Sequence, residues 1–169
     1  MSRDSSLWVQ VDVEAQLLFL LAGDVRLHQW PVSTALNGVG EQIDSGCTPR
    51  GEHRVRIKIG AACPIGTVFV GRRPTGEIYN EALAAQEPHR DWILSRIIWL
   101  AGIQSGRNRG GDCDTLRRYI YIHGCPDSAP VGAPVSHGCI RMRNADVIEL
   151  FEHVEAGTRV LISERIEGS

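Results

Sequence analysis

Residues 119–125 read Tyr-Ile-Tyr-Ile-His-Gly-Cys, and residues 136–142 read Ser-His-Gly-Cys-Ile-Arg-Met. The first stretch is rich in aromatic and β-branched residues with a period of two, which predicts a strand that delivers His123 to a loop. That loop returns Cys139 between a glycine and a branched apolar residue. A catalytic cysteine needs a neighbouring imidazole, and backbone donors that stabilise a thiolate and later an oxyanion. We therefore predict Cys139 as a nucleophile and His123 as its general base.

Each of these two residues also has a plainer interpretation. A cysteine is more often a small buried hydrophobe than a nucleophile, and a histidine on a strand is more often structural. Gly138 favours catalysis, because a glycine before the nucleophile lets the backbone approach a substrate closely, and the amides of Gly138 and Cys139 can then point at an oxyanion. By spacing alone, His137 could also be the base.

The pair His123-Gly124, followed by residues 136–141, resembles the signature of the L,D-transpeptidase catalytic domain of the YkuD type. Residues 27–34 (LHQWPVST) and 48–53 (TPRGEH) are similar to an early strand and a Thr-Pro-x-Gly turn of that family. The resemblance covers nearly the whole chain. It implies a β-rich α+β domain, a sandwich of strands over residues 1–169 that acts on peptidoglycan stem peptides and requires no cofactor.

The resemblance also implies roles for residues beside the nucleophile. The backbone carbonyl of Gly124 would orient the imidazole of His123. The amide of His137 would join those of Gly138 and Cys139 in the oxyanion hole, and the His137 side chain would shape the site rather than act as the base.

Four further residues are predicted to bind substrate. Ser136 is expected to hydrogen-bond within its loop beside the substrate, and Arg141 either holds a substrate carboxylate or braces its strand, two options that remain equal here. Tyr121 would share one face of the strand with Tyr119 and His123, forming an aromatic wall. Arg109 lies in residues 102–114, a long glycine-rich loop that we interpret as a lid, the alternative being a passive solvated loop.

A metal site is the competing interpretation from another class of protein. His123 and Cys125 form one His-x-Cys pair, and His137 and Cys139 form another, and two histidines with two cysteines can bind zinc tetrahedrally. Paired ligands in zinc fingers are usually separated by two to four residues, so this spacing favours catalysis without metal.

Composition limits the remaining functions. A chain of 169 residues suits one domain, and its formal charge of −2 argues against nucleic acid or an anionic membrane as the main partner. The longest apolar run, residues 17–22, is too short to span a bilayer. Residues 1–6 show no secretory signal, and five cysteines without regular spacing suit a reducing compartment. Four of these, at positions 47, 63, 113 and 125, are interpreted as bystanders.

From these features we expect a cytoplasmic L,D-carboxypeptidase that trims muropeptide tetrapeptides to tripeptides. The alternative is a transpeptidase that forms cross-links or exchanges D-amino acids, because both reactions use the same nucleophile, base and oxyanion hole. The oligomeric state stays open.

The coarse pattern predicts mainly strands. Period-two or short apolar runs at 7–12, 16–21, 25–32, 53–59, 67–71 and 158–163 predict strands. Residues 73–76 are expected to form a turn, residues 80–90 carry no predicted element, and 92–101 fit either strand or helix, with the resemblance favouring strand for 95–100. One helix is predicted, with Asn144 as its N-cap, Val147, Ile148, Phe151 and Val154 as its apolar stripe, and Gly157 as its end.

Overall fold

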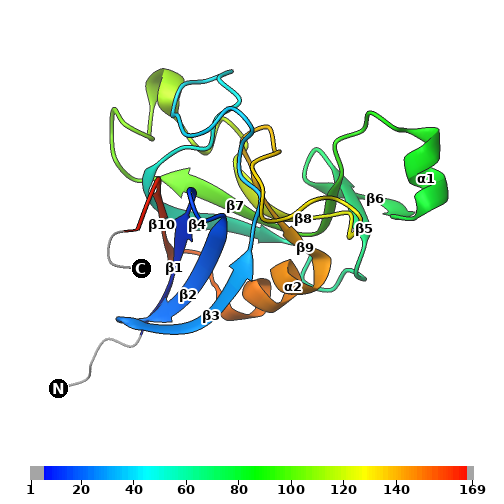
Figure 1. Cartoon of the computed structure of the whole chain (residues 1–169), viewed down its shortest axis with the longest axis horizontal. Helices are drawn as coiled ribbons and strands as arrows, with labels where there is room; N and C mark the ends of the chain where they lie inside the picture. The colour runs from blue at the N-terminus through cyan, green and yellow to red at the C-terminus, as the bar shows by residue number, and fades with distance from the viewer. Residues whose placement is uncertain (1–5, 167–169) are drawn as a thin grey trace.

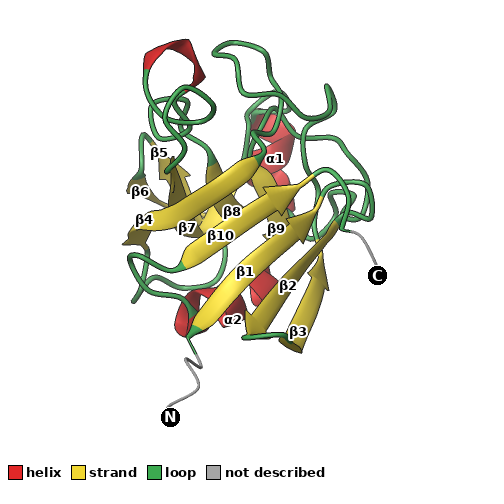
Figure 2. Ribbon diagram, turned by 90° about the vertical axis from the view of Figure 1, so that its left-hand side faces the viewer, coloured by secondary structure: helices red, strands yellow, loops and turns green. Residues whose placement is uncertain are grey.

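The computed structural model describes residues 6–166, and this part of the chain is mainly β. Its strands join in one continuous sheet in the order β3-β2-β1-β10-β4-β7-β5-β6, with β8 paired to β7 and β9 paired to β8. The strands are β1 (Leu7–Asp12), β2 (Leu17–Ala22), β3 (Val25–Pro31), β4 (Gly51–Ile59), β5 (Thr67–Val70), β6 (Arg73–Ile78), β7 (Ile93–Gly102), β8 (Tyr121–Cys125), β9 (Ile140–Arg143) and β10 (Arg159–Ser163). Figure 2 shows β3, β2, β1, β10 and β4 as a twisted front layer with the remaining strands behind them.

The predicted β-rich class is confirmed, and so is the N-terminal meander of β1, β2 and β3. β10 pairs in parallel with β1 and antiparallel with β4, so the two ends of the described chain meet in the middle of the sheet. The main core lies between the front strands, β8, β9 and helix α2 (Asn144–His153), and includes Val11, Leu20, Ile98 and Leu150. No helix within residues 6–166 is long and apolar enough to cross a membrane.

β7 is the ten-residue strand for which periodicity did not distinguish strand from helix. It pairs with β4 and then β5 along one side and with β8 on the other. Residues 94–98 are all buried, which explains why no alternation is visible in the sequence. Ser95 has a positive φ of 70°, and the pairing with β8 shifts register between Leu94 and Ile97, so the strand carries a bulge here.

Three local predictions were wrong. Residues 73–76 belong to strand β6, and the turn falls earlier, at Gly71-Arg72, where both residues have positive φ. Residues 80–90, expected to be irregular, contain helix α1 (Glu81–Gln86), which begins because the Asn80 side chain accepts the Leu83 N–H at 2.7 Å.

The third error concerns α2, whose existence is confirmed. Arg143 is the N-cap and makes no side-chain capping bond, whereas Asn144 is the first helical residue. The helix ends at His153, so Gly157 lies in the following turn. The buried stripe contains Leu150 in place of the predicted Ile148, which is only half-buried.

Candidate active site

Parallel pairing of β8 with β9 brings the two motifs together. Ile122 pairs with Ile140 and His123 with Arg141, so Cys139 lies immediately before β9, beside the strand that carries the histidine. Cys139 and His123 line the same cleft, which has a volume of about 290 Å³. A parallel pair joins segments distant in the chain, which is why sequence spacing alone did not predict this register.

The cleft is built from four short segments of the chain. Its lining residues are Gly71, Arg72, Asp91, Ile93, Arg118, Tyr119, Ile120, Tyr121, His123, His137, Cys139 and Arg141. Sequence reasoning missed Arg72 and Asp91. Each stands in a charged surface-type segment, and no sequence signal distinguished these residues from their charged neighbours.

The sulfur of Cys139 contacts the backbone of residues 119–121. The Tyr121 N–H donates to Sγ at 3.3 Å, and Sγ lies 3.4 Å from the carbonyl oxygen of Tyr119, to which the thiol can donate. Burial raises the pKa of the thiol to about 11, although the Tyr121 amide and the guanidiniums of Arg141 and Arg118 oppose that rise. At neutral pH the resting nucleophile is therefore a thiol rather than a thiolate.

His123 is buried, with 1% of its surface exposed. Its Nδ1 lies 2.7 Å from the carbonyl oxygen of Gly124. A carbonyl only accepts, so Nδ1 carries the hydrogen and the lone pair of Nε2 is free to take a proton. Burial lowers the pKa of this imidazole, and at neutral pH it stays uncharged, the form a general base requires.

Gly124 is constrained by packing as well as by this contact. A Cβ built on it would lie 2.6 Å from Asn144 Oδ1 and 2.6 Å from the carbonyl oxygen of Leu94. Asn144 cannot move away easily, because its side chain also bonds Ser95 Oγ and the carbonyl oxygen of Cys125. Asn144 therefore supports the loop end of β8 instead of capping α2.

Of the three backbone amides predicted to form the oxyanion hole, one already donates a hydrogen bond among the described residues and two do not. The Gly138 N–H donates to Ser136 Oγ at 3.2 Å, and the Ser136 hydroxyl donates to the Cys139 carbonyl at 2.6 Å. The Gly138 carbonyl accepts from Thr48 Oγ1 at 2.9 Å. The amides of His137 and Cys139 make no hydrogen bond within residues 6–166, so these two remain available to an oxyanion.

Ser136 was predicted to hydrogen-bond within its loop beside the substrate; the bonds within the loop are present, and contact with substrate stays a prediction. The residue is 1% exposed, and its hydroxyl bonds the loop in both directions. It braces the nucleophile loop.

Arg141 and Tyr121 both line the cleft. The backbone of Arg141 pairs with Ser33 in both directions, and its guanidinium lies 3.2 Å from Asp91. Arg141 thus braces its strand while its charge faces the cleft. The Tyr121 hydroxyl accepts from Arg72 at 3.2 Å. Tyr119, Tyr121 and His123 all line the cleft, although Tyr119 lies before β8 with a positive φ of 56° and not on the strand as predicted.

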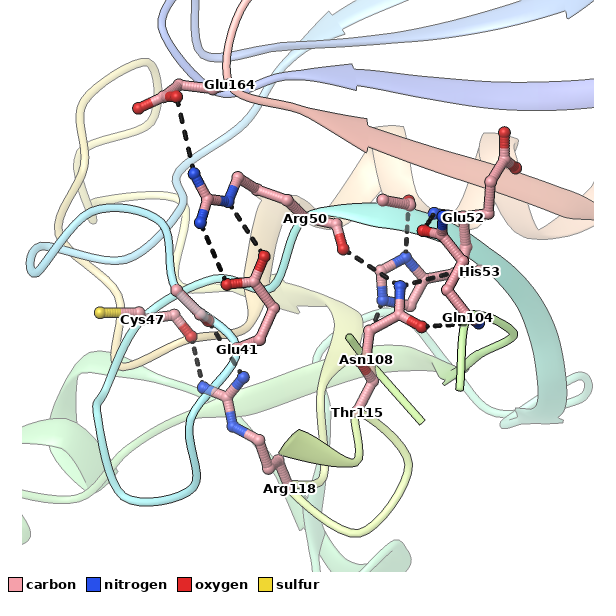
Figure 3. Close-up of polar contacts among 12 residues, drawn as sticks. Glu41, Cys47, Arg50, Glu52, His53, Gln104, Asn108, Thr115, Arg118 and Glu164 are labelled. Atoms are coloured by element: carbon pink, nitrogen blue, oxygen red, sulfur yellow. Dashed lines mark hydrogen bonds and ion pairs between the residues drawn. The ribbon is translucent and has the colours of Figure 1, made fainter. Parts of the chain in front are cut away.

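The predicted lid is a fastened loop that does not line the cleft. Figure 3 shows the buried side chain of Asn108 bonded to the backbone of residues 50 and 52, and Thr115 bonded to His53. Arg109 lines a different hollow, beside Arg54 and Asp114, and not the Cys139 cleft, so this position does not support its predicted role in binding substrate.

Arg118 follows this loop and does reach the cleft. Its guanidinium donates to the carbonyl oxygen of Cys47 at 2.6 Å (Figure 3) and to that of Gly40 at 3.2 Å. Burial lowers the pKa of Arg118 only relative to its ordinary, strongly basic value, so it remains a cation.

The four residues of the alternative zinc site do not converge. Cys125 is buried, its thiol donates to the carbonyl oxygen of Met142 at 3.3 Å, and it does not line the cleft that contains the other three. Burial raises the pKa of Cys125 to about 11. Metal ligation by a cysteine requires the thiolate, which such a pKa disfavours.

The chain is similar in sequence to known proteins. Residues 6–162 match the model of the YkuD family, the L,D-transpeptidase catalytic domain. The chain is 44% identical over 66 residues to the putative L,D-transpeptidase YkuD of Bacillus subtilis strain 168, covering 36% of this chain and 40% of that protein. It is 50% identical over 50 residues to the probable L,D-transpeptidase ErfK/SrfK of Salmonella typhimurium strain LT2, covering 30% of this chain and 16% of the relative.

Solved structures show the same fold. An L,D-transpeptidase from Mycobacterium smegmatis superposes with a TM-score of 0.54 at 18% identity, covering 94% of this chain and 58% of that one. The structure of Bdellovibrio bacteriovorus Bd1075 gives a TM-score of 0.62 at 17% identity, covering 96% and 49%. The chain thus spans well under two thirds of the length of these relatives.

Proposed function

Because this chain belongs to the L,D-transpeptidase catalytic domain family, we propose that it is a cysteine-dependent acyl-transfer enzyme acting on peptidoglycan stem peptides. One observation carries the proposal. Cys139 and His123 line one cleft, and the 2.7 Å contact between His123 Nδ1 and the Gly124 carbonyl leaves Nε2 free as the base. Two available amides, those of His137 and Cys139, complete the parts needed for acyl transfer.

In the proposed reaction, Cys139 Sγ attacks the carbonyl carbon of the diamino acid that precedes the terminal D-alanine. The thiol proton passes to His123 Nε2 as the C–S bond forms, and the amides of His137 and Cys139 hold the oxyanion. When the intermediate collapses, the C–N bond breaks and D-alanine leaves with the proton from His123. A thioester on Cys139 remains. Because both partners begin uncharged, proton transfer accompanies attack instead of preceding it.

The charge of the cleft favours a substrate that carries carboxylates. Arg72, Arg118 and Arg141 line it, against the single carboxylate of Asp91. Arg141 pairs with Asp91, whereas Arg118 bonds backbone carbonyls and Ser45, and Arg72 bonds a tyrosine hydroxyl. Two guanidiniums therefore face the cleft without an acidic partner among the described residues, and a peptide with free carboxylates would supply one.

We propose further that water resolves the thioester, which makes the enzyme an L,D-carboxypeptidase that converts tetrapeptide to tripeptide. The cleft has a volume of about 290 Å³, at the lower end of the range for ligand pockets in proteins. It suits the reacting end of one stem peptide, and water needs no second binding site. All five cysteines are free, which agrees with a role in a reducing cytoplasm, where soluble muropeptides are recycled.

The test is to incubate the protein with a disaccharide tetrapeptide, with and without a D-amino acid as acceptor, and to weigh the products. Tripeptide and free D-alanine should form in both reactions, and Cys139→Ala should form neither. Exchange of the acceptor into most of the product would instead identify a transpeptidase. Turnover by Cys139→Ala equal to that of the wild type would overturn the proposed function itself.

A further inference from the structure

Away from the cleft, we propose a binding site for a divalent transition-metal ion formed by His28 of β3 and by Glu149 and His153 of α2. Their ligand atoms all lie within 4.8 Å of one another, the only such group of three within residues 6–166. The site is independent of the proposed catalytic function, because none of its residues lines the Cys139 cleft.

The spacing of the donors is close to that of a bound ion. His28 Nδ1 lies 3.5 Å from Glu149 Oε1. Two ligands at about 2.0–2.2 Å from a tetrahedral zinc ion lie about 3.3–3.6 Å from each other. His28 Nδ1 and Glu149 Oε1 are therefore already as far apart as two ligands of one zinc ion. No two of the three ligand atoms are more than 4.8 Å apart, so any separation has to close by at most about 1.5 Å, which rotation of the side chains can supply.

The fold brings the three side chains together without metal. Glu149 and His153 are four residues apart on α2, so they lie on one face of the helix, a spacing that helical metal sites use. His28 stacks on Trp30, with ring centroids 5.3 Å apart and planes inclined by 8°. Trp30 is buried at 6% exposure and so fixes the imidazole of His28 against the core.

The surroundings favour a cation. His153 lies in the last turn of α2, where the helix dipole is negative, and its ring centroid lies 5.2 Å from that of His28. Two imidazoles with one carboxylate suit Zn²⁺, Co²⁺, Ni²⁺ or Cu²⁺ better than Mg²⁺ or Ca²⁺, which prefer oxygen ligands. The side chains of His28 and Glu149 are 39% and 48% exposed, so water can complete the coordination shell.

Binding there would connect two parts of the fold. β3 is the outer strand of the sheet, and α2 packs on β7, β8 and β9, the strands around the nucleophile. Figure 1 shows the C-terminal end of α2 beside the β2–β3 hairpin. An ion held by both would tie this outer strand to the helix and stabilise the folded chain.

The first experiment titrates Zn²⁺ into chelator-treated protein by calorimetry. We expect one ion per chain, with His28→Ala and His153→Ala each weakening the binding at least tenfold and Glu149→Gln weakening it without a change in side-chain size. His89→Ala is the matched control, because His89 is an exposed histidine outside the cluster, and its affinity should equal that of the wild type. Circular dichroism checks that each variant is folded.

The second experiment distinguishes this site from the free cysteines. Co²⁺ bound by thiolate shows an intense near-ultraviolet charge-transfer band, whereas Co²⁺ bound by imidazole and carboxylate does not. We expect the bound Co²⁺ to show a spectrum without the thiolate band. That spectrum should disappear in a His28→Ala/His153→Ala double variant. The proposal is overturned if that folded double variant binds one Zn²⁺ as tightly as the wild type, or if the Co²⁺ spectrum carries the thiolate band and is lost in Cys139→Ala instead.

Discussion

Alkylation of Cys139 should accelerate about tenfold for each pH unit between pH 7 and 10, because the reactive species is the thiolate. Burial raises the pKa of this thiol to about 11 from its ordinary value of 9.0. At pH 7, a thiol with that pKa is ionised in about one molecule in ten thousand, against about one in a hundred for an unperturbed thiol. Alkylation of Cys139 at pH 7 should therefore be about a hundredfold slower than alkylation of a solvent-exposed thiol with the ordinary pKa.

The contacts explain why the thiolate is disfavoured in the resting enzyme. Sγ receives one hydrogen bond, from the Tyr121 amide at 3.3 Å, and faces the Tyr119 carbonyl oxygen at 3.4 Å. The nearby guanidiniums are engaged elsewhere, Arg141 with Asp91 and Arg118 with backbone carbonyls. Since the pKa of His123 is lowered, the imidazole does not offer a positive charge either.

The assay measures the rate of carbamidomethylation of the Cys139 peptide by mass spectrometry, with glutathione in the same tube as the reference thiol. His123→Ala should leave the profile almost unchanged, because a neutral imidazole does not stabilise the anion. A plateau at or below pH 8 that disappears in His123→Ala would refute this reasoning, since it would show a thiolate–imidazolium pair in the resting enzyme.

Three further outcomes follow from the same contacts. Gly124→Ala should lower the free energy of unfolding by about 1–3 kcal/mol and reduce kcat, because the new Cβ would meet two atoms at 2.6 Å beside the carbonyl that orients the base; an unchanged urea midpoint would contradict this. Arg72→Ala should raise KM for a carboxylate-bearing tetrapeptide by about tenfold, while Arg109→Ala, outside the cleft, serves as the control and should change KM little; equal effects in steady-state kinetics would argue against the charge assignment. Burial lowers the pKa of His53 to about 4 in the folded protein. Between pH 6.5 and 4, His53 is therefore protonated in the unfolded chain but not in the folded one. The free energy of unfolding should fall by about 1.4 kcal/mol for each pH unit as the pH is lowered through that range. His53→Gln should flatten that slope in urea titrations, and a slope equal to that of the wild type would show that another group is responsible.

The local chemistry of this protein is readable in its sequence because it depends on neighbours in the chain. The contact between His123 and Gly124 joins adjacent residues, and the turn that presents Cys139 depends on Gly138, whose φ is +133°. The meander of β1, β2 and β3 likewise follows from period-two patterns and a short turn. Such features require no knowledge of the rest of the fold.

Features decided by distant contacts were predicted poorly. β7 shows no alternation because it is buried on both faces, and Asn144 is a strong capping residue in sequence but is used for tertiary bonds to Ser95 and Cys125. Glycines in residues 102–114 suggested mobility, yet the buried Asn108 fastens that loop to β4 and the residues before it.

The sequence alone determined which residues can do the chemistry, since a thiol, an imidazole and flexible glycines are properties of residue types and of their immediate neighbours. Tertiary structure decided which charges surround them. Arg72, Asp91 and Arg118 come from three separate segments, and only the pairing of β5, β7 and β8 places them around one sulfur. Tertiary structure also decided the ionisation of Cys139 and His123, because the free energy of a charge depends on how much water the whole fold removes from it.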